Sequence, residues 1–233
     1  MSALTIDAKI NDDVDVGRNL SALSRSPVEN TTPNVLSDIY REDTNIVIWQ
    51  RNLSNELTDA VNDFLQTNTT RATVLVVTPE NTHDVLKDTF GESDTLTTLG
   101  NDITLLVDMF CCLFDLKQAG LRLTILDRAM CPRFHVDRIP CRLVTTYQGI
   151  ATEWLNHAVV DRTKLGAGNQ GKADEQSGLF NNLKDINRLD EGDVALLKGE
   201  HWDETEGAGL VHRSPPVSAG ERRLLLTLDF ISD

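Results

Sequence analysis

The first half of the chain alternates between helical and strand-like hydrophobic patterns. Two helices are expected over residues 53–67 and 98–119, because apolar residues recur there every three to four positions. Ser54 stands in the N-cap position of the first helix, and Gly120 is the expected stop of the second. The other elements expected in this half are one further helix and two strands, over residues 81–90, 45–51 and 72–78.

After Gly120 the pattern changes to short aliphatic and β-branched runs separated by Gly, Pro and Asp, which predicts strands. The expected strands lie within residues 121–130, 133–139, 141–149, 192–199, 209–214 and 222–230. One polar insertion, residues 161–182, has no periodicity and is rich in Gly and Asn. We expect it to be an exposed, mobile loop that can act as a lid.

These patterns predict an α+β protein with a β-rich half backed by N-terminal helices. Residues 1–35 are polar, acidic and aperiodic, so they are expected to form a flexible arm. Residues 36–233 are expected to form one domain, in which 36–119 are an α/β support layer and 120–233 are the β core.

The net charge argues against nucleic acid and membranes as binding partners. The formal net charge is −14, from 36 acidic against 22 basic residues, so the surface should repel nucleic acid and anionic membranes. No apolar run near the length of a membrane span and no signal peptide are recognised, so a cytoplasmic location is expected. In that reducing compartment the four cysteines are expected to be free thiols or ligands.

The stretch "CPRFHVDRIPC", residues 131–141, carries a candidate metal site. On a strand, His135 and Asp137 would point to the same face about 6.6 Å apart. A 2-His-1-carboxylate site for Fe(II) needs a second imidazole, and His212 lies on a later strand pattern. His201 is a weaker candidate for the same role, because it lies in an acidic loop.

Ten residues after His212, Arg222 begins the last predicted strand. A guanidinium there can hold a dicarboxylate through two parallel, charge-assisted hydrogen bonds. Arg223 is adjacent, but alternation along the strand favours Arg222, which shares a face with Leu224, Leu226 and Leu228.

The order of His135-x-Asp137, "GDVALLKG" and "HRSPPVSAGER" in a run of short strands resembles the Fe(II)/2-oxoglutarate dioxygenases, in particular their prolyl-hydroxylase-like branch. This resemblance implies a double-stranded β-helix, a jelly-roll or cupin-like barrel, over residues 120–233. It also implies that His135, Asp137 and His212 bind catalytic iron and that Arg222 binds 2-oxoglutarate. Tyr147 is a further candidate, with its hydroxyl on a cosubstrate carboxylate.

The block "CPRFHVDRIPCRLVTTYQGIATEWL" is also similar to a family of bacterial proteins grouped as domain of unknown function 1826. That similarity covers residues 120–233 closely and the earlier residues more loosely. It implies no activity.

A second reading of the same stretch is a zinc site, because thiolates and imidazoles are the ligands that zinc prefers. Cys131 and His135 would lie about 13 Å apart on one extended strand, too far to share an ion. Cys141 remains possible if a turn folds it back towards Asp137. The alternative function is therefore a non-catalytic metal-binding protein, zinc-handling or regulatory, on a cupin-like barrel. The substrate of an oxygenase, a small molecule or a protein, stays open.

Overall fold

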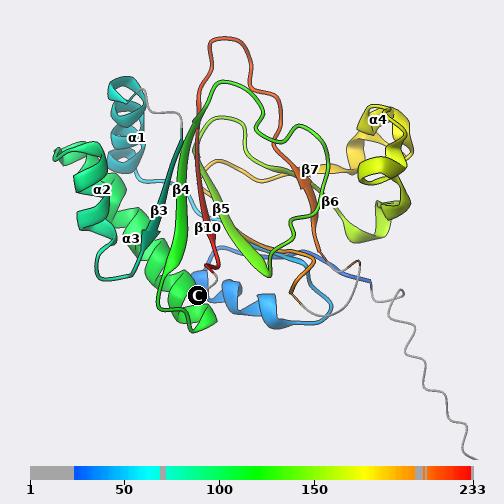
Figure 1. Cartoon of the computed structure of the whole chain (residues 1–233), viewed down its shortest axis with the longest axis horizontal. Coiled ribbons are helices and arrows are strands. Elements are labelled where there is room, and N and C mark those ends of the chain that lie inside the picture. Colours follow the sequence, from blue (N-terminus) through cyan, green and yellow to red (C-terminus); the bar gives the residue numbers. More distant parts are fainter. Residues whose placement is uncertain (1–23, 69–71, 203–206, 208, 232–233) are drawn as a thin grey trace, which may run out of the picture.

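The computed structural model describes residues 24–68, 72–202, 207 and 209–231. It is a mixed α/β structure in which three helices cover the outer side of a large sheet and a small sheet lies on the opposite side (Figure 1). The helices are α1 (Asn55–Thr67), α2 (Thr82–Phe90), α3 (Asp94–Phe114) and the short α4 (Asp174–Ser177).

The large sheet has seven strands in the order β1-β2-β8-β5-β10-β4-β3. Its strands are β1 (Val28–Asn30), β2 (Ile46–Trp49), β8 (Val194–Lys198), β5 (Cys141–Gln148), β10 (Arg223–Asp229), β4 (Ala119–Leu126) and β3 (Ala72–Val77). Only the β1–β2 pair is parallel. The small sheet has the order β7-β6-β9, with strands β7 (Ile186–Arg188), β6 (Glu153–Leu155) and β9 (Val211–Arg213).

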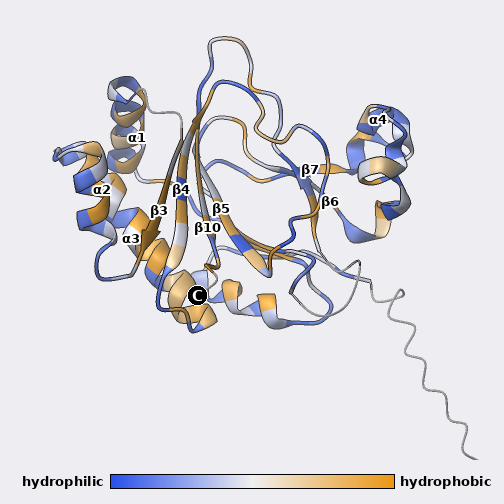
Figure 2. Ribbon diagram, in the orientation of Figure 1, coloured by the Kyte–Doolittle hydropathy of each residue, from blue (hydrophilic) through white to orange (hydrophobic). Residues whose placement is uncertain are grey.

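The main hydrophobic core lies between the large sheet and the helices. Alternate residues of β10, Leu224, Leu226 and Leu228, are fully buried there. They pack with the apolar side of α3, which carries buried residues at helical spacing, for example Leu99 and Ile103. Figure 2 shows the hydrophobic side of α3 beside β3 and β4. This core anchors the central strands that carry the site on their other face.

Helix α3 differs from the prediction at both ends. It begins at Asp94, where the Ser93 side chain accepts a hydrogen bond from the Leu96 backbone N–H. It ends at Phe114, because Asp115 adopts a left-handed conformation with φ 52°. Gly120, the expected stop, is instead part of β4.

By length and composition alone, α3 is a helix that could cross a membrane, contrary to the expectation that no such run exists. A core helix passes the same test, and one side of α3 is buried against the large sheet. Its Asp102 also forms an ion pair with Arg51, 2.7 Å between Nη1 and Oδ1. These contacts are those of a helix that packs within the protein.

The largest correction in the second half concerns residues 133–139, which form no strand. The only β-pairing there is an isolated bridge at His135. Pro132 and Pro140 lack the backbone N–H that a ladder requires, and the carbonyls of this segment bond instead to the turn after β8. The strands expected over 141–149, 192–199 and 222–230 are present as β5, β8 and β10.

The insertion over residues 161–182 is more ordered than expected. It contains two turns of 3-10 helix, Arg162–Lys164 and Gly166–Asn169, and then α4. Leu179 and Phe180 are buried in a small core with Phe134, so the segment is not a wholly exposed loop. Its mobility and its role as a lid stay predictions.

The expected flexible arm also needs a shorter boundary. Residues 28–30 form β1, which pairs in parallel with β2, and Pro33–Tyr40 form a 3-10 helix whose Val35, Leu36 and Ile39 are buried. Of these buried residues only Val35 falls within the predicted arm, and the three-residue strand β1 is too short for its pattern to predict a strand. The rest of that prediction, residues 1–23, lies outside the described residues.

Candidate metal centre

His135 and His212 face each other across an antiparallel bridge, although they are far apart in the sequence. The backbone N–H of each donates to the carbonyl of the other, and both N···O distances are 3.0 Å. His212 also pairs with Trp154 of β6, so it lies on the edge strand β9, between β6 and the bridge to His135. Backbone pairing therefore sets the positions of both imidazoles.

The loop that carries Asp137 is held by the turn that follows β8. Its carbonyls accept from Gly199 (at Pro140, 2.8 Å) and Glu200 (at Asp137, 2.9 Å). A Cβ on Gly199 would lie 2.0 Å from the Ile139 carbonyl oxygen, so only glycine allows this approach. The Gly after the predicted strand "GDVALLKG" thus contributes to the position of Asp137.

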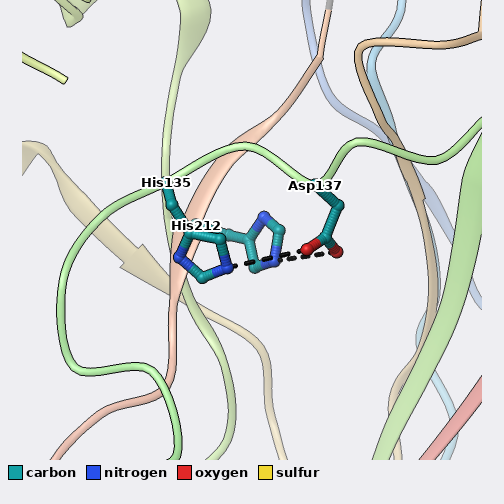
Figure 3. A group of neighbouring side chains, drawn as sticks. All are labelled: His135, Asp137 and His212. Atoms are coloured by element: carbon teal, nitrogen blue, oxygen red, sulfur yellow. Dashed lines mark ion pairs between the residues drawn. The ribbon is translucent and has the colours of Figure 1, made fainter. Parts of the chain in front are cut away.

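The three candidate ligands converge. One ligand atom from each of His135, Asp137 and His212 lies within 4.8 Å of the others (Figure 3). The Asp137 carboxylate is 3.6 Å from His135 Nε2 and 3.4 Å from His212 Nε2. Figure 3 shows both rings directed at this carboxylate, as ligands of one ion would be.

The opposite nitrogen of each ring contacts a backbone carbonyl. His135 Nδ1 is 2.9 Å from the Arg133 oxygen, and His212 Nδ1 is 3.2 Å from the Leu210 oxygen. Nδ1 of each ring is thus placed to donate to a carbonyl, and Nε2 is the nitrogen that faces Asp137. There Nε2 would donate to the carboxylate without a metal and bind the ion in its presence. The donor set and the ring orientation therefore fit a divalent ion of the Fe(II) or zinc type.

Asp137 remains ionised in this setting. Burial raises the pKa of Asp137, but hydrogen bonds with the two imidazoles and the charge of Arg142 outweigh burial and hold it well below its usual range. The hydrogen bond to Asp137 raises the pKa of His135 above its ordinary value. Arg142 Nη1 lies 2.7 Å from Asp137 Oδ2, and its other nitrogens bind Asp229. Arg142, on β5, thus orients the Asp137 carboxylate.

A network of charges fixes the N-terminal side of the same loop. The buried Asp174 accepts from the Phe134 backbone N–H at 2.8 Å and pairs with Arg133 at 2.9 Å. Arg213, next to His212, pairs with Glu153 at 2.8 Å and lies over the Phe134 ring, 4.3 Å from its centroid. Both imidazoles therefore lie on backbone whose neighbouring side chains form ion pairs with the buried carboxylates Asp174 and Glu153.

A cavity next to the three ligands is lined by one face of the central strands. Its walls include His135, His212 and residues of β4, β5 and β10, namely Arg122, Arg142, Val144, Arg223, Leu225 and Thr227. The cavity therefore has one wall on the metal centre and a strongly basic wall on the large sheet.

Arg223 is the most deeply buried of these arginines, with no exposed surface. Its guanidinium donates only to hydroxyls, those of Ser214, Thr146 and Thr152, at 2.9–3.1 Å. Its Nε is buried without a hydrogen-bond partner, and no carboxylate within the described part of the chain pairs with it. Burial lowers the pKa of Arg223 to about 10. Such a cation is a site for an anion.

Arg222, the residue favoured by the sequence, points away from the cavity. Its guanidinium donates to the carbonyls of Leu65 and Asn68 at the end of α1. Alternation does place Arg222 on the face of Leu224 and Leu226, but that face packs against the helices. The prediction chose the more apolar face of the strand, and the cavity lies on the other face.

Tyr147, which was expected to contact a cosubstrate carboxylate, also lies on the face that packs against the helices. It is buried on the helix side of β5, where its hydroxyl donates to Asp102 Oδ2 at 2.7 Å. Cys141, the possible zinc ligand, is also buried on that side and outside the cluster, while Cys131 is exposed and lines the cavity. His201 is exposed and lies outside the cluster as well.

The sequence pattern did not single out the arginines that line the cavity, Arg122, Arg142 and Arg223. A signal for two of them was present, because Arg122 and Arg142 each interrupt an otherwise apolar strand at a position with two apolar neighbours, whereas Arg223 follows Arg222 at the start of its strand. An arginine within such a strand needs either an acidic partner or a ligand.

The comparisons with known proteins agree with this architecture. The model of a family described as protein of unknown function, DUF1826, matches residues 30–229. The chain belongs to this family. No match is found among curated proteins.

The structure of this DUF1826 protein is similar to the dioxygenase for auxin oxidation from Arabidopsis thaliana in complex with 2-oxoglutarate (10% identity, 90% of this chain and 93% of that chain, TM-score 0.51). It is also similar to the dioxygenase for auxin oxidation in rice (9% identity, 89% and 83% of the chains, TM-score 0.51). At these identities the similarity concerns the fold alone.

Proposed function

We propose that this DUF1826 protein is a non-haem, Fe(II)- and 2-oxoglutarate-dependent oxygenase of the hydroxylase type. The observation that carries the proposal is that Arg223, a fully buried cation without a carboxylate partner in the described chain, shares one cavity with His135 and His212. A metal-binding protein needs the three ligands only. A buried guanidinium beside them is explained by an anionic cosubstrate.

The proposal extends to the fold. The cavity lies between the central strands of the large sheet and β9 of the small sheet, an arrangement that supports a double-stranded β-helix. The two dioxygenases of similar fold support this assignment.

In the proposed site, His135, Asp137 and His212 would hold the iron, which when bound would supply the activation of dioxygen. Arg223 binds the far carboxylate of 2-oxoglutarate, assisted by the hydroxyls of Thr146 and Thr152. Overall, 2-oxoglutarate, dioxygen and a C–H bond of the substrate become succinate, carbon dioxide and an alcohol.

The remaining residues of the site orient these groups. Arg142 keeps the Asp137 carboxylate ionised and directed at the two imidazoles, and it is neutralised by Asp229 on its other side. The apolar Val144 and Leu225 also line the cavity and reduce its polar surface.

A cytoplasmic location belongs to the same proposal. The four cysteines, of which Cys131 is exposed beside the site, are free thiols in the structure. This state is the one expected in a reducing compartment.

The adjacent arginines provide a matched test. The protein is loaded anaerobically with Fe(II), and the change in melting temperature on adding 2-oxoglutarate is measured, together with succinate formation in air. We expect a shift and succinate in the wild type and in Arg222→Ala, and neither in Arg223→Leu, with iron content equal in all three. A 2-oxoglutarate shift that survives in Arg223→Leu would overturn the assignment. Iron binding without any shift in the wild type would favour a metal-binding protein.

A further inference from the structure

The face of the large sheet that lines the cavity extends beyond it to the edge strand β3. The small sheet does not cover this edge, so two valines of β3 point outwards. Val74 is 65% exposed and Val76 is 55% exposed, the largest exposures of any valine described. Thr73, Leu75 and Val77 alternate with them and face the helices. An apolar surface therefore continues outwards from the candidate metal centre.

Arg122 lies where this surface meets the cavity. It pairs directly with Val74 on one side and with Thr227 on the other, so these three side chains form one row across the sheet. Its Nε is buried without a hydrogen-bond partner, and no acidic residue in the described ranges forms an ion pair with it. Arg142 and Arg213, which line the same cavity, are both paired with carboxylates. Arg122 is thus a second cation, besides Arg223, that is available to an anion.

A groove of about 490 Å³ runs along this row. Ala72, Val74, Leu126 and Met130 provide apolar walls, and Arg122 is in the wall as well. Met130 and Arg122 also line the cavity of the metal centre, so the two spaces share a wall. The groove has the size of a site for a small organic molecule. Asp127 and Arg128 also line it, and Arg122 is the cation that it shares with the cavity of the metal centre.

We propose that the primary substrate is an organic monocarboxylate with an apolar body, its carboxylate held by Arg122 and its body along Val74 and Met130. This inference rests on the proposed function, because it names what the oxygenase would oxidise. One unpaired guanidinium matches one negative charge, and an anion in a protein of net charge −14 requires such a local cation. Two separate arginines also keep substrate and 2-oxoglutarate apart, since Arg223 lies on a different strand.

Octanoate is the probe, with octan-1-ol as its uncharged counterpart. Binding to the full chain is measured by calorimetry, with and without Fe(II). We expect octanoate to bind at least about tenfold more tightly than octan-1-ol, because charge-assisted hydrogen bonds are the stronger kind. Arg122→Gln should remove this preference, while the exposed Arg41→Gln should retain it.

A second variant, Val74→Glu, keeps the test decisive if Arg122→Gln does not fold. Val74→Glu changes an exposed position and places a carboxylate opposite Arg122, so it should also abolish the preference for octanoate. Val74→Glu lies outside the cavity of the metal centre and should keep the 2-oxoglutarate-dependent melting shift, which separates a failure of this inference from a failure of the proposed function. The inference is overturned if octanoate and octan-1-ol bind equally, or if both variants bind octanoate as the wild type does. It is also overturned if the chain is a dimer that Val74→Glu dissociates, because a second copy would then cover the valines.

Discussion

The two faces of the large sheet share the same strands but have opposite characters. On the face towards α1 and α3, alternate residues such as Leu143 and Leu226 are fully buried among aliphatic and aromatic side chains. On the other face, the intervening positions hold Arg142, Arg223 and Thr227. The helix-covered face stabilises the fold. The buried arginines of the other face cost folding free energy and are available to ligands.

This difference shows how one strand serves both purposes. A one-residue step along β10, from Leu224 to Arg223, leads from the core to the cavity. Substitutions on the two faces should therefore separate stability from ligand binding. The expected effects below run from the largest to the smallest.

The strongest test of the site face is removal of a metal ligand. His212→Ala should lower Fe(II) affinity by at least about 100-fold, since even residues that only support metal ligands change affinity by 10–100-fold. His201→Ala, at an exposed histidine outside the cluster, should leave affinity unchanged. Anaerobic titration of the metal-free protein measures both. Equal loss in the two variants would mean that neither histidine is specific to the site.

The corresponding test of the helix face is Asp102→Ala. This change leaves Arg51 without its carboxylate and Tyr147 without its acceptor, so the free energy of unfolding should fall by on the order of 3 kcal/mol. Fe(II) binding to the folded variant should remain. Asp108→Ala, on the exposed side of the same helix, is the control and should change stability by less than about 0.5 kcal/mol. Urea denaturation measures both, and a stable Asp102→Ala protein would contradict the division between the faces.

Replacing Arg223 should raise the free energy of unfolding, whereas Asp102→Ala should lower it. Arg223→Met removes a cation whose burial is not compensated by a carboxylate, so the free energy of unfolding should rise by about 1–2 kcal/mol in the absence of ligand. A fall of that size, measured by the same denaturation, would show that the three hydroxyl contacts already compensate for the buried charge.

The smallest expected effect concerns Tyr147. Tyr147→Phe removes one hydrogen bond to Asp102 and should cost about 1 kcal/mol of unfolding free energy. The melting shift caused by 2-oxoglutarate should not change, because the hydroxyl lies on the helix side of the sheet. A smaller melting shift in this variant would indicate that the Tyr147 hydroxyl contacts 2-oxoglutarate after all.

Much of the local structure and the three ligands were predictable from the sequence. Ser54 marked the start of α1, and the pattern of β5, β8 and β10 was clear. His135, Asp137 and His212 were selected because their residue types and their order are specific. The structure brings the three side chains together, and their role as metal ligands stays a prediction. The predictions that failed, Arg222 and Tyr147 as cofactor ligands and residues 133–139 as a strand, all depended on what packs against a segment rather than on the segment itself.

The sequence by itself determined which residues alternate along each strand, where the helices have their apolar sides, and which side chains have the chemistry of iron ligands. Only the tertiary structure decided which side of the central strands meets the helices, and therefore that Arg223 and not Arg222 enters the cavity. It also decided that His135 reaches His212 through a backbone bridge. The physical reason is that periodicity is a local property of the chain, whereas both faces of a central sheet contain apolar residues. The choice between them depends on contacts with segments that are distant in sequence.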